Sequence, residues 1–334
     1  MATTVNVLSY LQTRTQVDVD SLDIEAARRG GPDGPWTDAT SNQAEVFFQI
    51  EKAENIDTVR EAINKSQQLH ATFPSLTLPE LMVEVATVLL AARVLPFITG
   101  SVHVMANPCY AFSIPKIVET GHRYHEIFRH VNPDVDLSRV VMKVPATFEG
   151  LRACRELHGS GIKTLATTVF TMEQAILAGE AGCVSISPFI HELKMGFDST
   201  YKDNDSLVDL CVKAQQYYEQ HSIPTRVKAC SCITIDEILQ LAGVAAHTIP
   251  PEDLDALVSM KEDKNDLDAK SLFKPKLFAN GHQQVRAYID DEAKYRVEFA
   301  ASDGGKGQLR LYQAVSIFSD FQKKAELKME SIGA

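Results

Sequence analysis

Short apolar stretches rich in β-branched residues alternate with amphipathic stretches along most of the chain. The strand-like stretches are TQVDVD, SVHVMA, RVVMKVPA, IKTLATTV, CVSISPF, TRVKACS and VAAHTI. Between them lie helix-like stretches, such as FEGLRACRELHGSG from Phe148 and TMEQAILAGEAG from Thr171, and each ends in a glycine, as helices commonly do. Strands that alternate with helices are typical of a parallel sheet. The pattern therefore predicts an α/β protein built from strand–helix units.

A further strand ending near TDATSN brings the number of units to about eight, which favours a closed (β/α)8 TIM barrel over an open sheet. Neither GxGxxG nor GxxxxGK[ST] follows the first strand, so nucleotide binding is not indicated. The glycine-rich SDGGKGQ from Ser302 is interpreted as a loop, and a helix is expected from about Leu309 to Met329. We predict one domain over residues 1–334, with a C-terminal helical extension at about 290–334 that covers one end of the barrel.

Composition narrows the classes of partner. The net charge is −11 and the pI is near 5.4, and no cluster of lysine and arginine of the kind that binds phosphate backbones is present. The most apolar stretch, Val83 to Ile98, is interrupted by Glu84 and Arg93, so it falls short of a membrane span. We interpret it as a buried helix running into a strand, and we expect neither a nucleic-acid partner nor a membrane.

The termini and the cysteines indicate a cytoplasmic protein. MATTVNVLSYLQTRTQ lacks the basic start and continuous apolar core of a secretory signal, while Arg14 with no acid before Asp18 leaves a transit peptide open. The six cysteines contain no CxxC pair, and reduced core thiols are favoured over metal binding or pairing at Cys230 and Cys232. We therefore expect no disulfides.

Lys143 lies in the apolar run RVVMKVPA, where a cation needs an explanation, because lysine is seldom buried without a partner or a chemical role. Near the carboxyl end of a barrel strand, its side chain points toward the mouth where such folds place their chemistry. A low-dielectric setting favours the free amine, which attacks carbonyls and forms an iminium that allows C–C bond cleavage. The alternatives are an ammonium that reaches solvent or one that pairs with Asp20.

The segment KVPATFEGLRACRELHGSGIKTLATTVFTMEQAILAGEAGCVSISPFI, from Lys143 to Ile190, resembles the transaldolase family of class I aldolases, which are α/β barrels. The similarity extends more weakly from VDSLDI to LAGVAAHTIPP, so it covers nearly the whole chain. The combination of a lysine before [IV]P-A-T-x-E-G with ISPF about forty residues later is specific to this family in a way that no single motif is.

The resemblance implies a role for several residues. Lys143 matches the Schiff-base lysine, Asp20 the proton-transfer aspartate, and Thr167 the threonine that helps to hold the catalytic water. The implied substrate-binding residues are Asn42, Ser187 and, more weakly, Ser231. Without the resemblance, helix or turn capping explains Asp20, Asn42 and the two serines, and strand packing explains Thr167.

The chain also departs from the family. His103 aligns with the catalytic glutamate, although a shifted alignment places Met105 there, and only a histidine can accept a proton near neutral pH. Leu165 stands where classical transaldolases have an asparagine, a change also found in the related fructose-6-phosphate aldolases.

Both phosphate-binding arginines are replaced, by Glu192 and by Ile233. A carboxylate in place of a guanidinium repels a phosphate. Replacement charges are available at Lys194, Arg226 and Lys228 if these side chains reach the mouth, although solvated surface positions are favoured for all three.

These features predict an enzyme in which Lys143 transfers or releases a dihydroxyacetone-type three-carbon unit between ketose and aldehyde substrates, with the pentose phosphate pathway as the expected setting. Asp20 moves protons, and His103 and Thr167 handle the water. The resemblance implies no cofactor or metal, a small carbonyl or sugar substrate, and leaves a homodimer open. The alternatives are a specialised aldolase for an unphosphorylated metabolite and a non-catalytic barrel that acts as a binding subunit.

Overall fold

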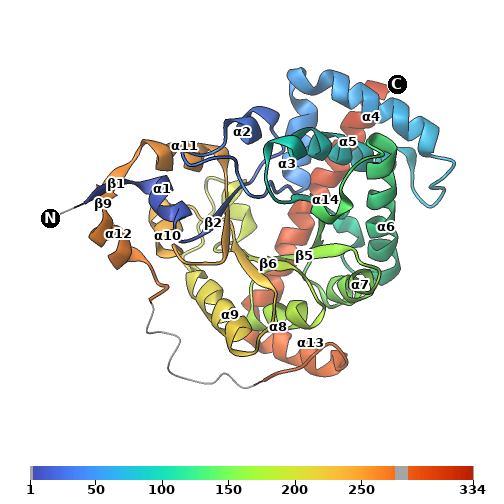
Figure 1. Ribbon diagram of the computed structural model, residues 1–334. Helices are drawn as coiled ribbons and strands as arrows, with labels where there is room; N and C mark the ends of the chain where they lie inside the picture. The colour runs from blue at the N-terminus through green and yellow to red at the C-terminus, as the bar shows by residue number, and fades with distance from the viewer. Residues whose placement is uncertain (1–2, 275–284, 334) are drawn as a thin grey trace.

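Seven parallel strands form the central sheet of the computed structural model, which describes residues 3–274 and 285–333 (Figure 1). Their order is β2-β8-β7-β6-β5-β4-β3, so consecutive strands from β3 to β8 are neighbours, β2 pairs with β8, and β2 and β3 form the two ends of the sheet. The strands are β2 (Gln16–Val19), β3 (Val102–Met105), β4 (Val140–Pro145), β5 (Lys163–Val169), β6 (Ser185–Pro188), β7 (Arg226–Ala229) and β8 (Ala246–Ile249). This arrangement is the α/β TIM-barrel-like fold that the alternating pattern predicts.

A single residue occupies the place of the missing strand between β2 and β3. Ala39 forms parallel bridges to Val19 on one side and to Val102 on the other. The amide of Thr40 donates to the Val19 carbonyl at 2.9 Å, and the amide of His103 donates to the Ala39 carbonyl at 2.9 Å. The predicted strand near TDATSN is therefore present in its shortest form, and it brings Asp38 and Thr40 to the barrel.

Helices surround the strands and cover the barrel from outside (Figure 1). The helices are α1 (Val7–Gln12), α2 (Ile24–Arg29), α3 (Gln43–Glu51), α4 (Ile56–Leu69), α5 (Leu78–Val94), α6 (Ile114–Val131), α7 (Phe148–Gly159), α8 (Met172–Glu180), α9 (Val208–Gln220), α10 (Ile235–Gln240), α11 (Pro251–Ser259), α12 (Lys264–Lys270), α13 (Glu292–Ala301) and α14 (Lys306–Gly333). Gly161 and Gly182, with φ of 75° and 78°, follow α7 and α8, as the sequence predicts for glycines that end helices.

The apolar stretch from Val83 is the buried helix α5, whose start is fixed by a capping box between Thr77 and Glu80. The helix ends at Val94, and β3 begins only at Val102, so a connecting segment separates the two. Within the described part of the chain, no helix combines the length and apolarity needed to cross a bilayer. All six cysteines lie in the described residues and are free thiols.

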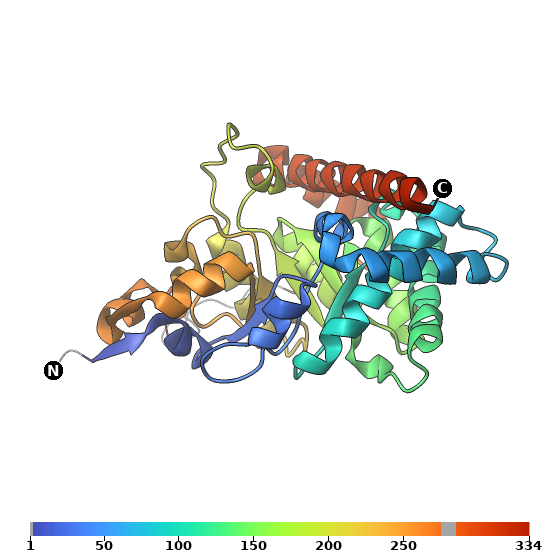
Figure 2. The same ribbon diagram turned by 90° about the horizontal axis from the view of Figure 1, so that it is seen from above.

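The C-terminal helix α14 lies across one side of the barrel and packs against α3 and α5 (Figure 2). It begins at Lys306, three residues earlier than the sequence predicts, because SDGGKGQ is not a loop throughout. Residues Ser302–Gly305 form the short 3-10 helix η7, in which Gly304 and Gly305 have φ of 60° and 90°. These left-handed conformations reverse the chain between α13 and α14.

A small antiparallel pair lies outside the barrel. Strand β1 (Thr4–Asn6) pairs with β9 (Lys261–Asp263), and Asn6 caps α1 by accepting a hydrogen bond from the amide of Ser9 at 3.0 Å. This pair holds the segment before β2 against the segment after β8. The sequence pattern did not predict it, because three-residue strands leave too short an alternation to recognise.

Candidate functional site

Lys143 is the fourth residue of β4, in register with Met105 of β3 and Leu165 of β5. Its side chain is only 5% exposed. Among the residues that the structure describes, its ammonium has neither a hydrogen-bond acceptor nor an ion-pair partner. The alternative ion pair with Asp20 is therefore absent among the described residues, and only a small part of the Lys143 side chain reaches solvent.

Asp20 follows β2 at the carboxyl end of the barrel. Thr40 donates a hydrogen bond from its hydroxyl to the Asp20 carboxylate at 2.5 Å, and the Thr40 hydroxyl also contacts that of Thr248 at 2.7 Å. Burial raises the pKa of the nearby Cys230 thiol to about 12, and the charge of Lys143 lowers this pKa while that of Asp20 raises it. The charges of Lys143 in β4 and of Asp20 after β2 therefore both influence the pKa of the Cys230 thiol, so both residues lie near it.

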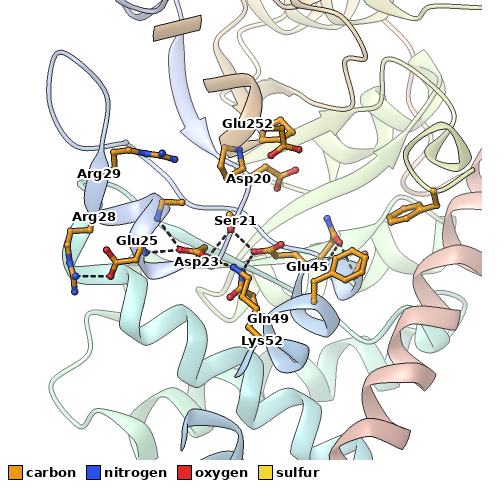
Figure 3. A pocket seen from close by; sticks show the side chains of 17 residues that line it. Asp20, Ser21, Asp23, Glu25, Arg28, Arg29, Glu45, Gln49, Lys52 and Glu252 are labelled. Carbon is orange, nitrogen blue, oxygen red and sulfur yellow. Dashed lines mark hydrogen bonds and ion pairs between the residues drawn. The ribbon is translucent and has the colours of Figure 1, made fainter. Parts of the chain in front are cut away.

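Asp20 and Asn42 line a cavity of about 790 Å³ (Figure 3). Asn42 also caps α3, since its side-chain oxygen accepts hydrogen bonds from the amides of Ala44 and Glu45 at 3.0 and 3.1 Å. The capping explanation for Asn42 is therefore confirmed, and it leaves only the amide nitrogen to contact a ligand. Lys143 is not among the residues that line this cavity.

Glu45 is a second carboxylate in this cavity, and the sequence did not single it out. It accepts hydrogen bonds from the Ser21 hydroxyl at 2.6 Å and from the amide of Leu22 at 2.7 Å. Burial raises its pKa, and the negative charge of Asp20 contributes in the same direction. Glutamate three residues after an asparagine reads as a helix start, so the sequence signal indicated capping and not chemistry.

Two residues near the carboxyl ends of strands have strained backbones. Thr168, at a register shift in β5, has φ of 57°, and Ser231, which follows β7, has φ of 59°. Positive φ is rare for residues other than glycine and gathers at functional sites. The first turns the chain directly after Thr167, and the second is itself a predicted substrate-binding residue.

The predicted polar residues Thr167, Ser187 and Ser231 lie on or directly after strands β5, β6 and β7. Thr167 is buried in β5 beside Pro145. Ser187 is buried in β6, and its hydroxyl finds no hydrogen-bond partner among the described residues. Ser231 donates to the sulfur of Cys230 at 3.9 Å. A buried hydroxyl without a partner is costly unless a ligand satisfies it, so Ser187 is well suited to bind substrate.

His103 lies elsewhere, toward the amino ends of the strands. It is in register with Val141, two residues before the pair formed by Met105 and Lys143, and it lines a second cavity of about 290 Å³. Its Nε2 lies 3.2 Å from the Asp38 carboxylate, and its Nδ1 is buried without a partner among the described residues. Because a carboxylate only accepts, Nε2 carries the proton and Nδ1 keeps a lone pair.

Burial lowers the pKa of His103 to about 4; Asp38 opposes this shift, and the charges of Lys228 and Lys143 add to it. His103 is therefore neutral at neutral pH. The role of His103 as a base stays a prediction. The β3 residue directly beside Lys143 is Met105 and not His103.

Lys228 is buried inside the barrel. It is 2% exposed, lies 2.9 Å from the Asp38 carboxylate and pairs with Asp18 as well. Burial acts to lower the pKa of Lys228, but the two carboxylates outweigh it and raise the pKa. The interpretation of Lys228 as a surface or mouth cation was therefore wrong.

Arg226 stands at the amino end of β7, where its guanidinium donates to the side-chain oxygen of Gln16 at 2.6 Å and to the Ala245 carbonyl at 2.7 Å. It is exposed, as the sequence favoured, and it lies at the opposite end of the barrel from Asp20. Neither Lys228 nor Arg226 can replace a phosphate-binding arginine at the mouth.

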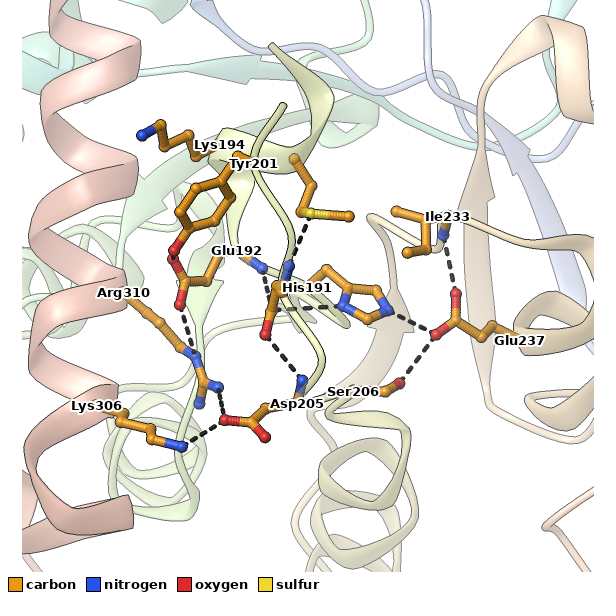
Figure 4. A network of polar contacts seen from close by, with 12 residues as sticks. His191, Glu192, Lys194, Tyr201, Asp205, Ser206, Ile233, Glu237, Lys306 and Arg310 are labelled. Atoms are coloured by element: carbon orange, nitrogen blue, oxygen red, sulfur yellow. Dashed lines mark hydrogen bonds and ion pairs between the residues drawn. The ribbon is translucent and has the colours of Figure 1, made fainter. Parts of the chain in front are cut away.

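Glu192 and Ile233 belong to a network of polar contacts between the segments that follow β6 and β7 (Figure 4). Glu192 accepts hydrogen bonds from the Tyr201 hydroxyl at 2.5 Å and from the Gln313 side chain at 2.7 Å, and Arg310 of α14 lies 3.8 Å away. The amide of Ile233 donates to Glu237 at 3.0 Å. A carboxylate therefore occupies the first arginine position, at Glu192, and another lies beside the second, where Glu237 contacts Ile233.

Lys194 is the one replacement cation close to this network. Its ammonium lies 4.5 Å above the Tyr201 ring and 3.6 Å from the Asp198 carboxylate. The buried guanidinium of Arg310 donates to Asp303 at 2.7 Å. Both cations have a carboxylate nearby with which a phosphate would compete, although Nε and Nη2 of Arg310 have no hydrogen-bond partner among the described residues.

The chain matches the family model described as Transaldolase/Fructose-6-phosphate aldolase over residues 17–302. It is 29% identical over 260 residues to a transaldolase of Prochlorococcus marinus, covering 75% of this chain and 76% of that protein. It is 27% identical over 331 residues to a transaldolase of Shewanella oneidensis, covering 98% of each. A transaldolase of Shewanella baltica is 28% identical over 299 residues, covering 88% of this chain and 89% of its own.

Proposed function

Because this chain belongs to the transaldolase/fructose-6-phosphate aldolase family, we propose that Lys143 forms a Schiff base through which a dihydroxyacetone-type three-carbon unit is transferred or released. The observation that carries this proposal is the environment of Lys143. The residue is buried in β4 at the carboxyl side of the barrel and has no carboxylate partner among the described residues. A buried lysine with no carboxylate beside its amine is suited to present that amine to a carbonyl carbon and act as a nucleophile.

In the proposed reaction the free amine attacks the carbonyl carbon of a ketose, and loss of water gives an iminium. The bond between the next two carbons then breaks, and its electron pair moves into the iminium to form an enamine. Asp20 takes the proton from the hydroxyl at which the aldehyde product forms, since it lies at the same end of the barrel as Lys143. The enamine then attacks a second aldehyde, or it is protonated, and hydrolysis restores the lysine.

The neighbouring hydroxyl groups supply binding in this scheme. Ser187 offers an unpartnered hydroxyl on β6, and Asn42 offers its amide nitrogen at the edge of the cavity. Thr167 holds the water that hydrolyses the imine. His103 is the second candidate base, because its Nδ1 keeps a lone pair, and it acts on the reacting atoms through a bridging water.

A specialised aldolase for an unphosphorylated metabolite is the second candidate. It is favoured by the carboxylates at and beside the two arginine positions, Glu192 and Glu237. Work in the pentose phosphate pathway requires sugar phosphates, whose charge these groups oppose. The two candidates share the Lys143 chemistry and differ only in the substrate.

The test is an intact-mass measurement after incubation with dihydroxyacetone and reduction with borohydride. The parent is expected to gain the mass of one reduced donor, and peptide mapping is expected to place it on Lys143. Lys143→Met removes the label, whereas Lys163→Met, a change at an exposed strand lysine that donates to the Ser138 carbonyl, keeps it. Labelling that survives in Lys143→Met would overturn the proposal.

A further inference from the structure

The cavity beside Asp20 has an aromatic wall. Phe48 of α3 and Phe197, which follows η5 (Leu193–Gly196), both line the cavity and are 45% and 42% exposed. Both rings rest on Phe321 of α14, at centroid distances of 5.4 and 4.8 Å. Exposed aromatic rings that gather in a concave site are typical of surfaces that contact an apolar ligand.

The charged side chains of the same cavity disfavour an anionic ligand. Its wall contains more carboxylates than cations; the carboxylates are Asp20, Asp23, Glu25, Glu45 and Glu252, and the cations are Arg28, Arg29 and Lys52. Each cation is paired: Arg28 with Glu25 at 2.8 Å, Arg29 with Asp255 at 3.0 Å, and Lys52 with Asp23. A phosphate entering this cavity would therefore meet excess negative charge and only cations that are already paired.

We propose that the aldehyde accepted at this site is uncharged and has an apolar body, such as a phenyl ring, that packs against Phe48 and Phe197. This inference rests on the proposed function, because it assigns the acceptor of the Lys143-bound three-carbon unit. The cavity wall holds Asp20 and Asn42, which can contact the aldehyde group, and the two rings, which can contact the remainder of the molecule. Apolar contact there replaces the phosphate grip as the source of remote binding energy.

The step that joins the two substrates balances with these partners alone. The iminium of dihydroxyacetone on Lys143 loses a proton from the carbon next to it to Asp20 and becomes the enamine. The enamine carbon then bonds to the aldehyde carbon, the carbonyl electron pair moves to the aldehyde oxygen, and that oxygen takes the proton back from Asp20. Water then hydrolyses the iminium, which releases a hydroxyketone and restores the amine. Dihydroxyacetone as donor supplies the three-carbon unit, and no oxidant or reductant is needed.

The kinetic test compares kcat/KM for phenylacetaldehyde with that for erythrose 4-phosphate in the full-length chain, with dihydroxyacetone as donor. Phenylacetaldehyde is expected to be preferred by about tenfold or more, on the scale of apolar specificity pockets. Phe48→Ala and Phe197→Ala are expected to lower this preference through a raised KM for phenylacetaldehyde. Phe112→Ala is the matched control, since Phe112 is 52% exposed and lies in a different cavity. A preference of the parent for erythrose 4-phosphate, or equal effects of all three substitutions, overturns the inference.

A binding measurement separates this inference from the Lys143 chemistry. Saturation-transfer NMR with 2-phenylethanol, which cannot react, is expected to show ring contacts in the parent and in Phe112→Ala and to lose them in Phe48→Ala and Phe197→Ala. If borohydride fails to label Lys143, the proposed function fails, and this measurement still decides whether the two rings hold an apolar ligand. Equal saturation transfer in all four proteins overturns the aromatic site.

Discussion

The ammonium of Lys228 lies 2.9 Å from the carboxylate of Asp38 inside the barrel, and it also pairs with Asp18. Lys143 is buried to a similar extent but has no such partner among the described residues. The barrel therefore contains two buried lysines in opposite settings. Two carboxylates keep Lys228 charged, whereas Lys143 has none beside it, which is the setting that the proposed Schiff-base chemistry uses.

We predict that Lys228→Met destabilises the protein by roughly 3–5 kcal/mol, because it leaves two buried carboxylates without their cation. Urea unfolding followed by circular dichroism measures this free energy. Lys163→Met is the matched control and is expected to change it by less than about 1 kcal/mol, since this lysine is exposed. Equal unfolding free energies of the two variants would show that the ion pairs of Lys228 do not stabilise the fold.

We predict that Asp20→Asn lowers turnover by roughly 100-fold or more while borohydride still traps a donor on Lys143. The asparagine keeps the shape of the side chain and can still accept the hydrogen bond from Thr40, but it cannot take a proton. Steady-state rates and trapping yields are measured on the same preparation. An unchanged rate assigns Asp20 to structure, and a lost imine assigns it to imine formation.

His103 is predicted to make the folded state less stable as the pH falls. Its pKa of about 4 in the fold is below the ordinary value near 6.5, so the unfolded chain binds more protons between these two pH values. The stability contributed by neutral His103 is complete above about pH 6.5 and is lost as the pH falls toward 4. The charges that face this residue are Asp38, Lys228 and, from β4, Lys143.

The variant His103→Gln is expected to lose up to about 3 kcal/mol of this dependence, measured as the difference in unfolding free energy between pH 7 and pH 4. His247 also makes the fold less stable as the pH falls, because burial lowers its pKa to about 3. It is present in both proteins, so its contribution cancels in the comparison. If His103 is also the base, the acidic limb of the parent's pH–rate profile lies near pH 4, below the ordinary histidine value. Superimposable limbs in parent and variant would remove His103 from the mechanism.

The fold was predictable because its signal repeats along the chain. Each strand–helix unit is visible locally, as in RVVMKVPA followed by the helix from Phe148 to Gly159. The unit at Ala39 shows the limit, since a strand reduced to one bridging residue has no period of its own. The sequence placed a strand end near TDATSN, and that placement brought the number of units to about eight.

The site was predictable only where a motif identified it. Lys143 and Lys228 both stand in short apolar strands, so local sequence does not distinguish them. The partners of Lys228 lie 210 and 190 residues away along the chain, at Asp18 and Asp38, and only the closed barrel brings them together. Phe48 likewise looks like an ordinary helix residue until Phe197 and Phe321 are placed beside it.

The last prediction is that phosphorylated ketoses are poorer donors than unphosphorylated hydroxyketones. Glu192 is held by Tyr201 and Gln313 and is only partly offset by Arg310 at 3.8 Å, so its charge opposes a phosphate. The measurement is kcat/KM for fructose 6-phosphate against that for fructose and dihydroxyacetone.

Glu192→Gln keeps a hydrogen-bonding side chain and removes the charge, and it is expected to raise the relative kcat/KM of the phosphate ester by about tenfold. Glu192→Arg restores the family's cation but places it beside Arg310, so it is expected to help less than an isolated arginine would. A strong preference of the parent for fructose 6-phosphate would contradict this prediction and support ordinary transaldolase work in the pentose phosphate pathway.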